Sequence, residues 1–343
     1  MGRCPAVVPH VPGSQLNAFP RKASWPSTVL VSGMLLENTL VERRSLLRLV
    51  EENFQNFFPS GRELPELEFF PLGEDSWSYR CGPLWISIRR DLDGHFPGAY
   101  EVPLLLRESG KEFVLAPLAG HDGRVVHRIA DFPVVTFPYI ERATASSAPP
   151  TPGQLDLLIC QLHEVHTFEP PASRPVELPT EDFRFPFDND LDKALQAALN
   201  GAAAQCGPYG GLLADLVARR WGHLTALREE AARVADRCTA RWRGERPALT
   251  HGDPSLTNVL FGQGVDIIDW GGAMWAPPER DWAALTRVFG TAPQGRPAFL
   301  RFYELRWTLA EVAEYATRFT GPHTGDADDD AMWGRLARYL PQA

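Results

Sequence analysis

Residues 250 to 270 place three oxygen-bearing side chains within one short stretch, Asp253, Asn258 and Asp269. An aspartate on a loop can accept a hydrogen bond from a hydroxyl group and orient it, or take its proton. Carboxylate and amide oxygens are hard ligands, which Mg²⁺ prefers when it also binds phosphate oxygens and water. This order of residues therefore supplies the parts needed to move a phosphoryl group from a nucleotide to a hydroxyl.

Short apolar runs flank these three residues and predict the elements that position them. The first run ends at Thr250, after which Gly252 permits a sharp turn that most residues resist. The second and third runs, residues 259–261 and 267–268, predict a hairpin of two strands. This hairpin would bring Asp269 next to Asn258. Asp, Asn and Gly are also common in turns, so these residues could serve only to form turns. A purely structural role does not explain why Asp253, Asn258 and Asp269 occur together between apolar runs. The runs comprise residues 248–250, 259–261 and 267–268.

His251, two residues before Asp253, allows two interpretations. It can act as a general base, provided that it reaches the proton to be removed. It can also pack against its neighbours and shape the loop without touching a substrate. We favour the second interpretation, because Asp253 is the residue expected on the lip of the loop, within reach of an acceptor hydroxyl.

Residues 251 to 258 resemble the catalytic loop of the aminoglycoside phosphotransferase family, which is related to the protein kinases. Residues 267 to 270 are similar to the metal-binding segment of that family. The resemblance implies that Asp253 is the catalytic residue and that Asn258 and Asp269 hold Mg²⁺ on the phosphates of ATP or GTP. It also implies an α+β protein with a kinase-like, two-lobed fold, in which a small β-sheet lobe precedes a larger helical lobe.

The resemblance covers residues 45–335, and its C-terminal stretches, residues 301–319 and 322–326, are most similar to the spectinomycin phosphotransferase branch. In the first lobe it implies a nucleotide-covering loop at residues 70–76, a helix glutamate that normally pairs with a lysine, and a hinge between the lobes. It also implies that Asp281 supports the catalytic loop and does no chemistry. The nucleotide-binding residues implied, including the arginine discussed next, are Gly73, Ser76, Arg89, Glu101, Pro138, Tyr139 and Ile140.

The sequence departs from the family at the lysine that normally holds the α- and β-phosphates. Ser87 occupies that position on the third expected strand. Arg89 lies two residues further along, so its side chain is expected on the same face of the strand. Two interpretations are open: Arg89 replaces the lysine with a planar guanidinium, or it is a solvated charge at the end of a strand.

Patterns along the chain predict three regions. Residues 1–40 are expected to form an N-terminal extension, residues 41–138 an N-lobe that covers the nucleotide, and residues 139–343 a C-lobe with the catalytic loop and substrate-binding helices. Apolar alternation predicts strands at residues 67–70, 77–80, 84–89, 113–115 and 132–137. Apolar residues at helical spacing predict helices at 40–58, 99–110, 154–166, 191–199, 211–227, 228–243, 280–289, 298–319 and 331–340.

The composition is that of a soluble globular protein, with 44% hydrophobic residues and a formal net charge of −9. The negative charge argues against a nucleic-acid partner, and no apolar run reaches the length of a membrane span. Five scattered cysteines without CxxC spacing predict reduced thiols in the cytoplasm and no disulfide framework. We expect a monomer or a homodimer.

The acceptor is expected to bind to the C-lobe. Acidic side chains there would attract a polycationic antibiotic, although each one alone is typical of a solvated surface. We expect an antibiotic of the aminocyclitol, aminoglycoside or nucleoside type, with resistance as the outcome. A kinase for a metabolite such as choline, homoserine or a sugar is one alternative, and a nucleotide-binding protein without catalysis is another. The residues considered for acceptor contacts include Glu304, Glu311, Glu314, Trp221, Trp275 and Trp307.

Overall fold

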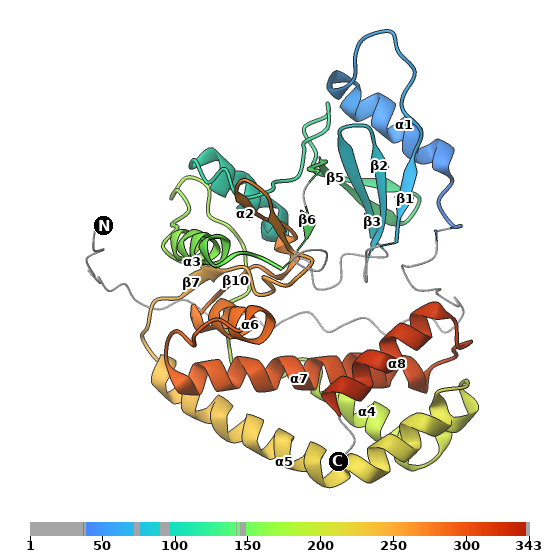
Figure 1. Ribbon diagram of the computed structural model, residues 1–343, viewed down its shortest axis with the longest axis vertical. Helices are drawn as coiled ribbons and strands as arrows, with labels where there is room; N and C mark the ends of the chain where they lie inside the picture. Colours follow the sequence, from blue (N-terminus) through green and yellow to red (C-terminus); the bar gives the residue numbers. More distant parts are fainter. Residues whose placement is uncertain are drawn as a thin grey trace.

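A sheet and then a set of long helices follow one another along the chain, which confirms the expected order of a β-rich first part and a helical second part. In Figure 1 the sheet lies in the upper part of the molecule, and the long helices cross the lower part. Most of the expected N-terminal extension lies outside the described residues, and the lobe boundaries stay predictions. The computed structural model describes residues 37, 39–71, 76–89, 97–141, 143–144 and 149–340.

The N-terminal sheet consists of β1 (Glu68–Phe70), β2 (Ser76–Cys81), β3 (Leu84–Arg89), β4 (Val126–Ile129) and β5 (Phe132–Pro138). Its strands are antiparallel, in the spatial order β1-β2-β3-β5-β4. β4 was not predicted, because adjacent His and Arg residues obscure its apolar alternation. The strand predicted at residues 113–115 is wrong: Val114 forms only an isolated bridge, with Ile267 of the catalytic segment.

The two faces of this sheet differ in chemistry, because successive side chains on a strand alternate between faces. Trp77, Tyr79, Ile86 and Ile88 are buried in one hydrophobic cluster with α1 (Arg43–Phe54). A 3₁₀ turn, η1 (Gln55–Phe57), follows α1 within the helix expected at residues 40–58. The other face of β2 and β3 carries a buried polar set. This set consists of Ser76, Ser78, Ser87 and Arg89.

Two small sheets hold the catalytic segment. β7 (Ala248–Thr250) pairs with β10 (Met274–Ala276), and β8 (Val259–Phe261) pairs with both β6 (Ala143–Thr144) and β9 (Val265–Ile267). A short 3₁₀ turn, η3 (Trp270–Gly272), follows β9 and contacts α2 (Pro97–Glu108). Val102 and Leu106 of α2 belong to the same buried cluster as Ile267 and Trp270. Packing on α2 therefore supports the hairpin that carries the expected metal ligands.

The helices of the second part are α3 (Pro152–His166), α4 (Asp188–Leu199), α5 (Gly210–Trp242), α6 (Glu279–Phe289), α7 (Pro297–Thr320) and α8 (Ala327–Tyr339), with a 3₁₀ turn, η2 (Ala202–Gln205). Thr151 and Gln154 form a capping box that starts α3. The two helices predicted at residues 211–227 and 228–243 are one helix, α5, since neither Gly nor Pro stands near residue 228 to end the first. Within the described ranges, no helix has the length and apolar content to cross a membrane.

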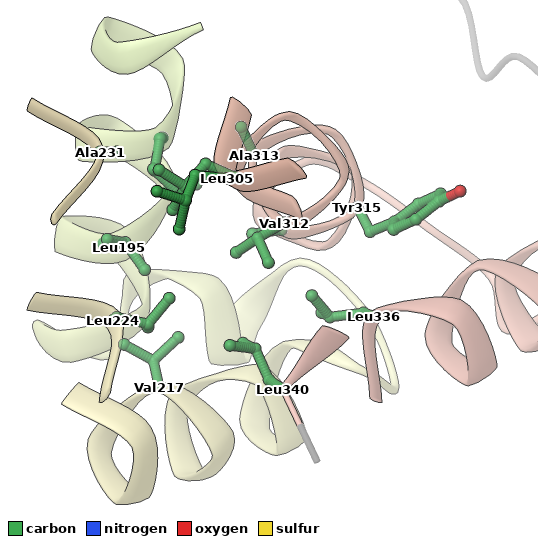
Figure 2. Packing of buried hydrophobic residues seen from close by; sticks show 14 of the residues in the cluster. Leu195, Val217, Leu224, Ala231, Leu305, Val312, Ala313, Tyr315, Leu336 and Leu340 are labelled. Carbon is green, nitrogen blue, oxygen red and sulfur yellow. The ribbon is translucent and has the colours of Figure 1, made fainter. Parts of the chain in front are cut away.

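The largest hydrophobic cluster joins α4, α5, α7 and α8. In Figure 2, Leu195 of α4, Leu224 of α5 and Leu305 of α7 point toward one another, and Leu336 of α8 approaches from another side. This packing gives α7 a rigid position below the catalytic segment, next to α6.

We expect that Phe302→Ala lowers the free energy of unfolding by about 3–5 kcal/mol, the usual cost of removing a buried phenyl ring. Phe302 is fully buried and contacts Phe183, Phe185 and Tyr303. Urea denaturation measures the change. The matched control is Leu212→Ala on α5, whose side chain is 48% exposed; a similar loss in both variants would show that this cluster does not hold the helices together.

Candidate active site

A tight turn after β7 carries the predicted catalytic residue. Gly252 in this turn has a φ of 94°, which only glycine adopts without strain. A Cβ on Gly252 would lie 2.1 Å from Nη1 of Arg280, so close packing also requires glycine here. Arg280 in turn donates a 3.0 Å hydrogen bond to the Thr250 hydroxyl. The conformation of the turn is thus determined by α6 as well as by its own sequence.

Asp281 holds the backbone of this turn in place. Its carboxylate accepts hydrogen bonds from the backbone N–H of His251 at 3.0 Å and of Gly252 at 2.6 Å, and a third from His166 Nε2 at 2.8 Å. The Asp281 side chain is completely buried. Burial raises the pKa of this carboxyl, but the bond and charge of His166 outweigh it and hold the pKa below its usual value. The structure therefore agrees with a supporting role for Asp281.

His251 stabilises the conformation of the loop through hydrogen bonds. Its Nε2 donates to the carbonyl oxygen of Ile268 at 2.9 Å, and its Nδ1 accepts from the N–H of Asp253 at 3.2 Å. The ring is fully buried and packs edge-on against Trp270, with centroids 4.8 Å apart. Because both ring nitrogens are engaged within the loop, His251 has no atom left for a substrate proton, as the loop-shaping interpretation requires.

Asp253 is held at one oxygen and unpaired at the other. Asn258 Nδ2 donates to Asp253 Oδ2 at 2.9 Å and to the Asp253 backbone carbonyl at 3.1 Å. Oδ1 is buried and has no hydrogen-bond partner among the described residues. Burial raises the pKa of this carboxyl, and the charge of Asp269 adds to the rise, while His251, Arg287 and the Ser255 hydroxyl oppose it without cancelling it. An unpaired, buried carboxylate oxygen is suited to accept a hydrogen bond from a substrate.

Asn258 and Asp269 are brought together by the predicted hairpin. The N–H of Ile268 donates to the Asn258 carbonyl at 2.9 Å. Asp269 has a left-handed conformation with φ 60°, and its carboxylate accepts from the N–H of Gly271 at 3.3 Å. The Asn258 amide donates to Asp253, and its Oδ1 accepts a 3.4 Å hydrogen bond from the Thr257 hydroxyl. An amide oxygen has two lone pairs, so Oδ1 can still bind a metal. One amide oxygen and one half-exposed carboxylate fit the donor set that Mg²⁺ uses beside phosphates.

Arg89 lies against this site. Its Nη2 is 3.6 Å from Asp269 Oδ1, and the residue is 6% exposed. That burial excludes the interpretation of Arg89 as a solvated charge. Ser87 lies on the same buried polar face, and Ser76 of β2 stands opposite Arg89 in the strand register. The strand that lacks the family lysine therefore directs an arginine toward the expected metal ligand.

The remaining predicted nucleotide residues occupy several environments. Gly73 lies outside the described residues. Glu101 is exposed on α2, while Arg89 lies 3.6 Å from Asp269. Pro138 ends β5, after which Tyr139 donates its N–H to the Pro83 carbonyl at 2.8 Å. Half-buried Ile140 follows in the chain.

The Tyr139 ring faces residues of the N-terminal sheet. It stacks on Trp85 at 16°, and the Arg80 guanidinium lies 4.1 Å from its centroid. Its ring and its amide are thus engaged within the first part of the protein. A nucleotide contact by this residue, which stays a prediction, would have to come from its carbonyl group.

Arg287 on α6 was missed by the sequence analysis. Its guanidinium lies 4.0 Å from the centroid of Trp307 on α7, and its Nη2 is buried without a hydrogen-bond partner in the described structure. Burial lowers the pKa of Arg287, although the charge of Asp253 opposes this shift. Trp307 also donates to the hydroxyl of Tyr339 at 3.0 Å. No local pattern distinguished it, because six residues separate Arg287 from Asp281 and place the two on different faces of α6.

Asp281→Asn should reduce the free energy of unfolding at pH 7 by roughly 3 kcal/mol, because it removes a buried charge from its partners. A lowered pKa contributes stability above the unfolded pKa of about 3.9, and this contribution is lost as pH falls through the folded pKa. The difference between wild type and variant should therefore shrink below about pH 4. Urea titrations at several pH values measure it, with exposed Asp156→Asn on α3 as the control. An equal loss at all pH values would contradict the role of the charge.

Comparisons with known proteins agree with this geometry. The profile of the phosphotransferase enzyme family matches residues 100–315. Protein StrN of Streptomyces griseus is 80% identical over 314 residues, which cover 92% of this chain and 98% of that protein. Both matches include the turn that carries Asp253, the pair Asn258 and Asp269, and α6.

Solved structures share the fold. A spectinomycin phosphotransferase in complex with ADP and spectinomycin superposes with a TM-score of 0.69 at 14% identity, covering 87% of this chain and 94% of that one. A GDP complex of an aminoglycoside 2′-phosphotransferase superposes with a TM-score of 0.53 at 16% identity, covering 87% and 96%. These similarities confirm the kinase-like two-lobed fold. Together with the profile match and the similarity to StrN, they show that the chain belongs to the phosphotransferase enzyme family.

Proposed function

We propose that this protein transfers the γ-phosphoryl group of ATP or GTP to a hydroxyl group of a small-molecule antibiotic of the aminocyclitol, aminoglycoside or nucleoside type. The observation that carries the proposal is Asp253, whose Oδ1 is buried and unpaired within the described structure while Asn258 holds Oδ2. A protein that only bound nucleotides would have no use for this oxygen. Phosphorylation would prevent the antibiotic from binding its target, so the biological outcome is resistance.

Asp253 would orient the acceptor. Its Oδ1 would accept the hydrogen bond of the hydroxyl and direct the oxygen lone pair at the γ-phosphorus. A new bond would form between these two atoms, the bond between the γ-phosphorus and its bridging oxygen would break, and the hydroxyl proton would pass to Asp253. The raised pKa of Asp253 favours this last transfer. Most of the rate enhancement would still come from positioning, because the transition state is loose.

Asn258 and Asp269 would hold Mg²⁺ between the nucleotide phosphates. The bound ion would neutralise charge on the phosphoryl group during transfer. The hydrogen bonds that Asn258 donates to Asp253 keep its amide oxygen turned away from that carboxylate. The same residue would thus orient both the catalytic carboxylate and the metal.

Arg89 would perform the task of the absent lysine. Its buried position 3.6 Å from Asp269 places a fixed positive charge where nucleotide phosphates would meet the metal. A guanidinium can bind two phosphate oxygens at once, which an ammonium cannot do with the same geometry. Ser76, directly opposite on β2, would add a hydroxyl. Ile140, whose N–H has no hydrogen-bond acceptor among the described residues, would contact the base at the hinge.

The acceptor would lie between α6 and α7, next to Asp253. Trp307 presents a flat ring there, with the Arg287 guanidinium 4.0 Å from its centroid. Glu304 and Glu311 contribute negative charge around Arg287. Such mixed charge suits a ring that carries both hydroxyl and amino groups, since hydroxyls can accept from an arginine while ammonium groups bind carboxylates.

The acceptor class can be tested with a panel of antibiotics and metabolites. Each compound would be incubated with the protein, Mg²⁺ and either ATP or GTP in the cytoplasm-like reducing conditions that its free cysteines require. Mass spectrometry would detect the gain of one phosphoryl group. Phosphorylation of antibiotics supports the proposal, whereas phosphorylation restricted to choline, homoserine or sugars would identify a metabolite kinase.

Asp253→Asn should lower turnover by about 10²–10⁴-fold, because it removes the group that accepts the hydroxyl proton. The Michaelis constant of the nucleotide should change little, since Asn258 and Asp269 remain. Steady-state kinetics measure both quantities. The wild-type rate should fall on acidification already above pH 4, because the pKa of Asp253 is raised above its ordinary value of about 3.9. Full activity of the variant would refute the mechanism; Asp215→Asn, exposed on α5, is the control.

Arg89→Ala should raise the Michaelis constant of the nucleotide by about tenfold or more, the effect of losing a charge-assisted hydrogen bond. Arg89→Lys should restore part of it, because a lysine keeps the charge but not the forked geometry. The same kinetic assay measures all variants, with exposed Arg62→Ala as the control. Unchanged nucleotide kinetics in Arg89→Ala would show that Arg89 does not replace the lysine.

A further inference from the structure

A groove of about 650 Å³ lies on the N-terminal part of the molecule, between α1 and β4. β4 is the edge strand of the sheet, and β5 separates it from β3, which carries Arg89. The groove is therefore distinct from the site built by Asp253, Asn258 and Asp269. Its walls include three arginines and a histidine. They are Arg48 of α1, Arg124 of the preceding turn, and His127 and Arg128 of β4.

His127 is the buried polar group of this groove. Its side chain is 7% exposed, and neither ring nitrogen has a hydrogen-bond partner in the described structure. A carboxylate oxygen of Asp122 lies 3.4 Å from Nε2 and faces that nitrogen as an ion-pair neighbour. The Phe54 ring packs edge-on at 5.5 Å and holds the imidazole in position. Buried polar atoms are nearly always paired, so the unpaired Nδ1 indicates a ligand atom as its partner.

The charge of the groove is opposite to that of the chain. Three arginines line it against one acid, Glu52 of α1. Asp122 lies beside it, 3.7 Å from Arg124, and reduces the excess without cancelling it. The protein as a whole carries a net charge of −9. A local excess of positive charge on an acidic protein favours an anionic ligand.

The N-terminal segment of the chain itself is a poor candidate for this ligand. Residues 1–36 contain Arg3, Arg21 and Lys22 but no aspartate or glutamate. A basic segment would be repelled by the arginines of the groove. This segment is therefore not the expected ligand, and the charge of the groove favours an anionic small molecule.

We propose that this groove binds a phosphate monoester of a small organic molecule. Arg48 and Arg124 would bind the phosphate oxygens, for which the forked guanidinium is well shaped. Arg128, whose guanidinium donates to the Asp131 carbonyl at 3.0 Å, would add positive charge nearby. Leu49, Val126 and Ile129 provide apolar walls for the organic part. The volume lies within the range of about 300–1,000 Å³ that small-molecule sites occupy. The proposal is independent of the acceptor proposed above.

The test is an NMR titration of the full chain labelled with ¹³C at histidine, in which the His127 ring signal is assigned by its loss in His127→Gln. The probes are inorganic phosphate, sulfate, glucose 6-phosphate and ADP. We expect saturable shifts of the His127 signal, and tighter binding of glucose 6-phosphate or ADP than of inorganic phosphate or sulfate. Signals from the catalytic site report ADP binding there separately.

The double variant Arg48→Ser/Arg124→Ser should weaken binding by about tenfold or more. Arg44→Ser/Arg62→Ser removes the same number of exposed charges outside the groove and should leave binding unchanged. An unmoved His127 signal with every probe, or wild-type binding by the first double variant, would overturn the proposal. Equal affinity for inorganic phosphate and for both organic phosphates would overturn its assignment of an organic ligand.

Discussion

The buried carboxylate of Asp281 accepts two hydrogen bonds from the backbone of the turn that carries Asp253 and a third from His166 of α3. These bonds join three segments that are far apart in the sequence. A completely buried charge is costly unless such partners surround it, so the catalytic turn, α3 and α6 must assemble together. The position of Asp253, and with it the hairpin that carries Asn258 and Asp269, depends on this arrangement.

The N-terminal sheet contributes by separating its two faces. Aromatic and branched side chains bind α1 on one face, which leaves serines and Arg89 on the other. Arg89 therefore meets Asp269 as part of a rigid strand, and its guanidinium does not need to be ordered when a nucleotide binds. Ser87 and Arg89 lie two residues apart on this strand, so their side chains point to the same face of the sheet.

Elements with a strong local pattern were predicted well. α3 has its capping box, α6 and α7 have regular apolar spacing, and the β8–β9 hairpin has a glycine-containing turn. The failures have physical reasons. α5 continues through the expected break because no residue there ends a helix, and β4 was missed because its inward side chains include a histidine. Residues 113–115 pack on the segment around Ile267, which is far away in the sequence. The alternation of apolar and polar residues cannot reveal such a long-range contact.

The sequence by itself determined the reaction class, because Asp253, Asn258 and Asp269 lie within one turn and one hairpin, where local spacing dictates proximity. It also suggested that His251 shapes the loop. Only the tertiary structure decided that Asp253 keeps one unpaired oxygen, that Arg89 reaches Asp269, and that Arg287 lies over Trp307. These contacts join residues of different elements, whose relative positions are set by packing of the whole core. The spacing of residues along the chain therefore cannot predict these distances.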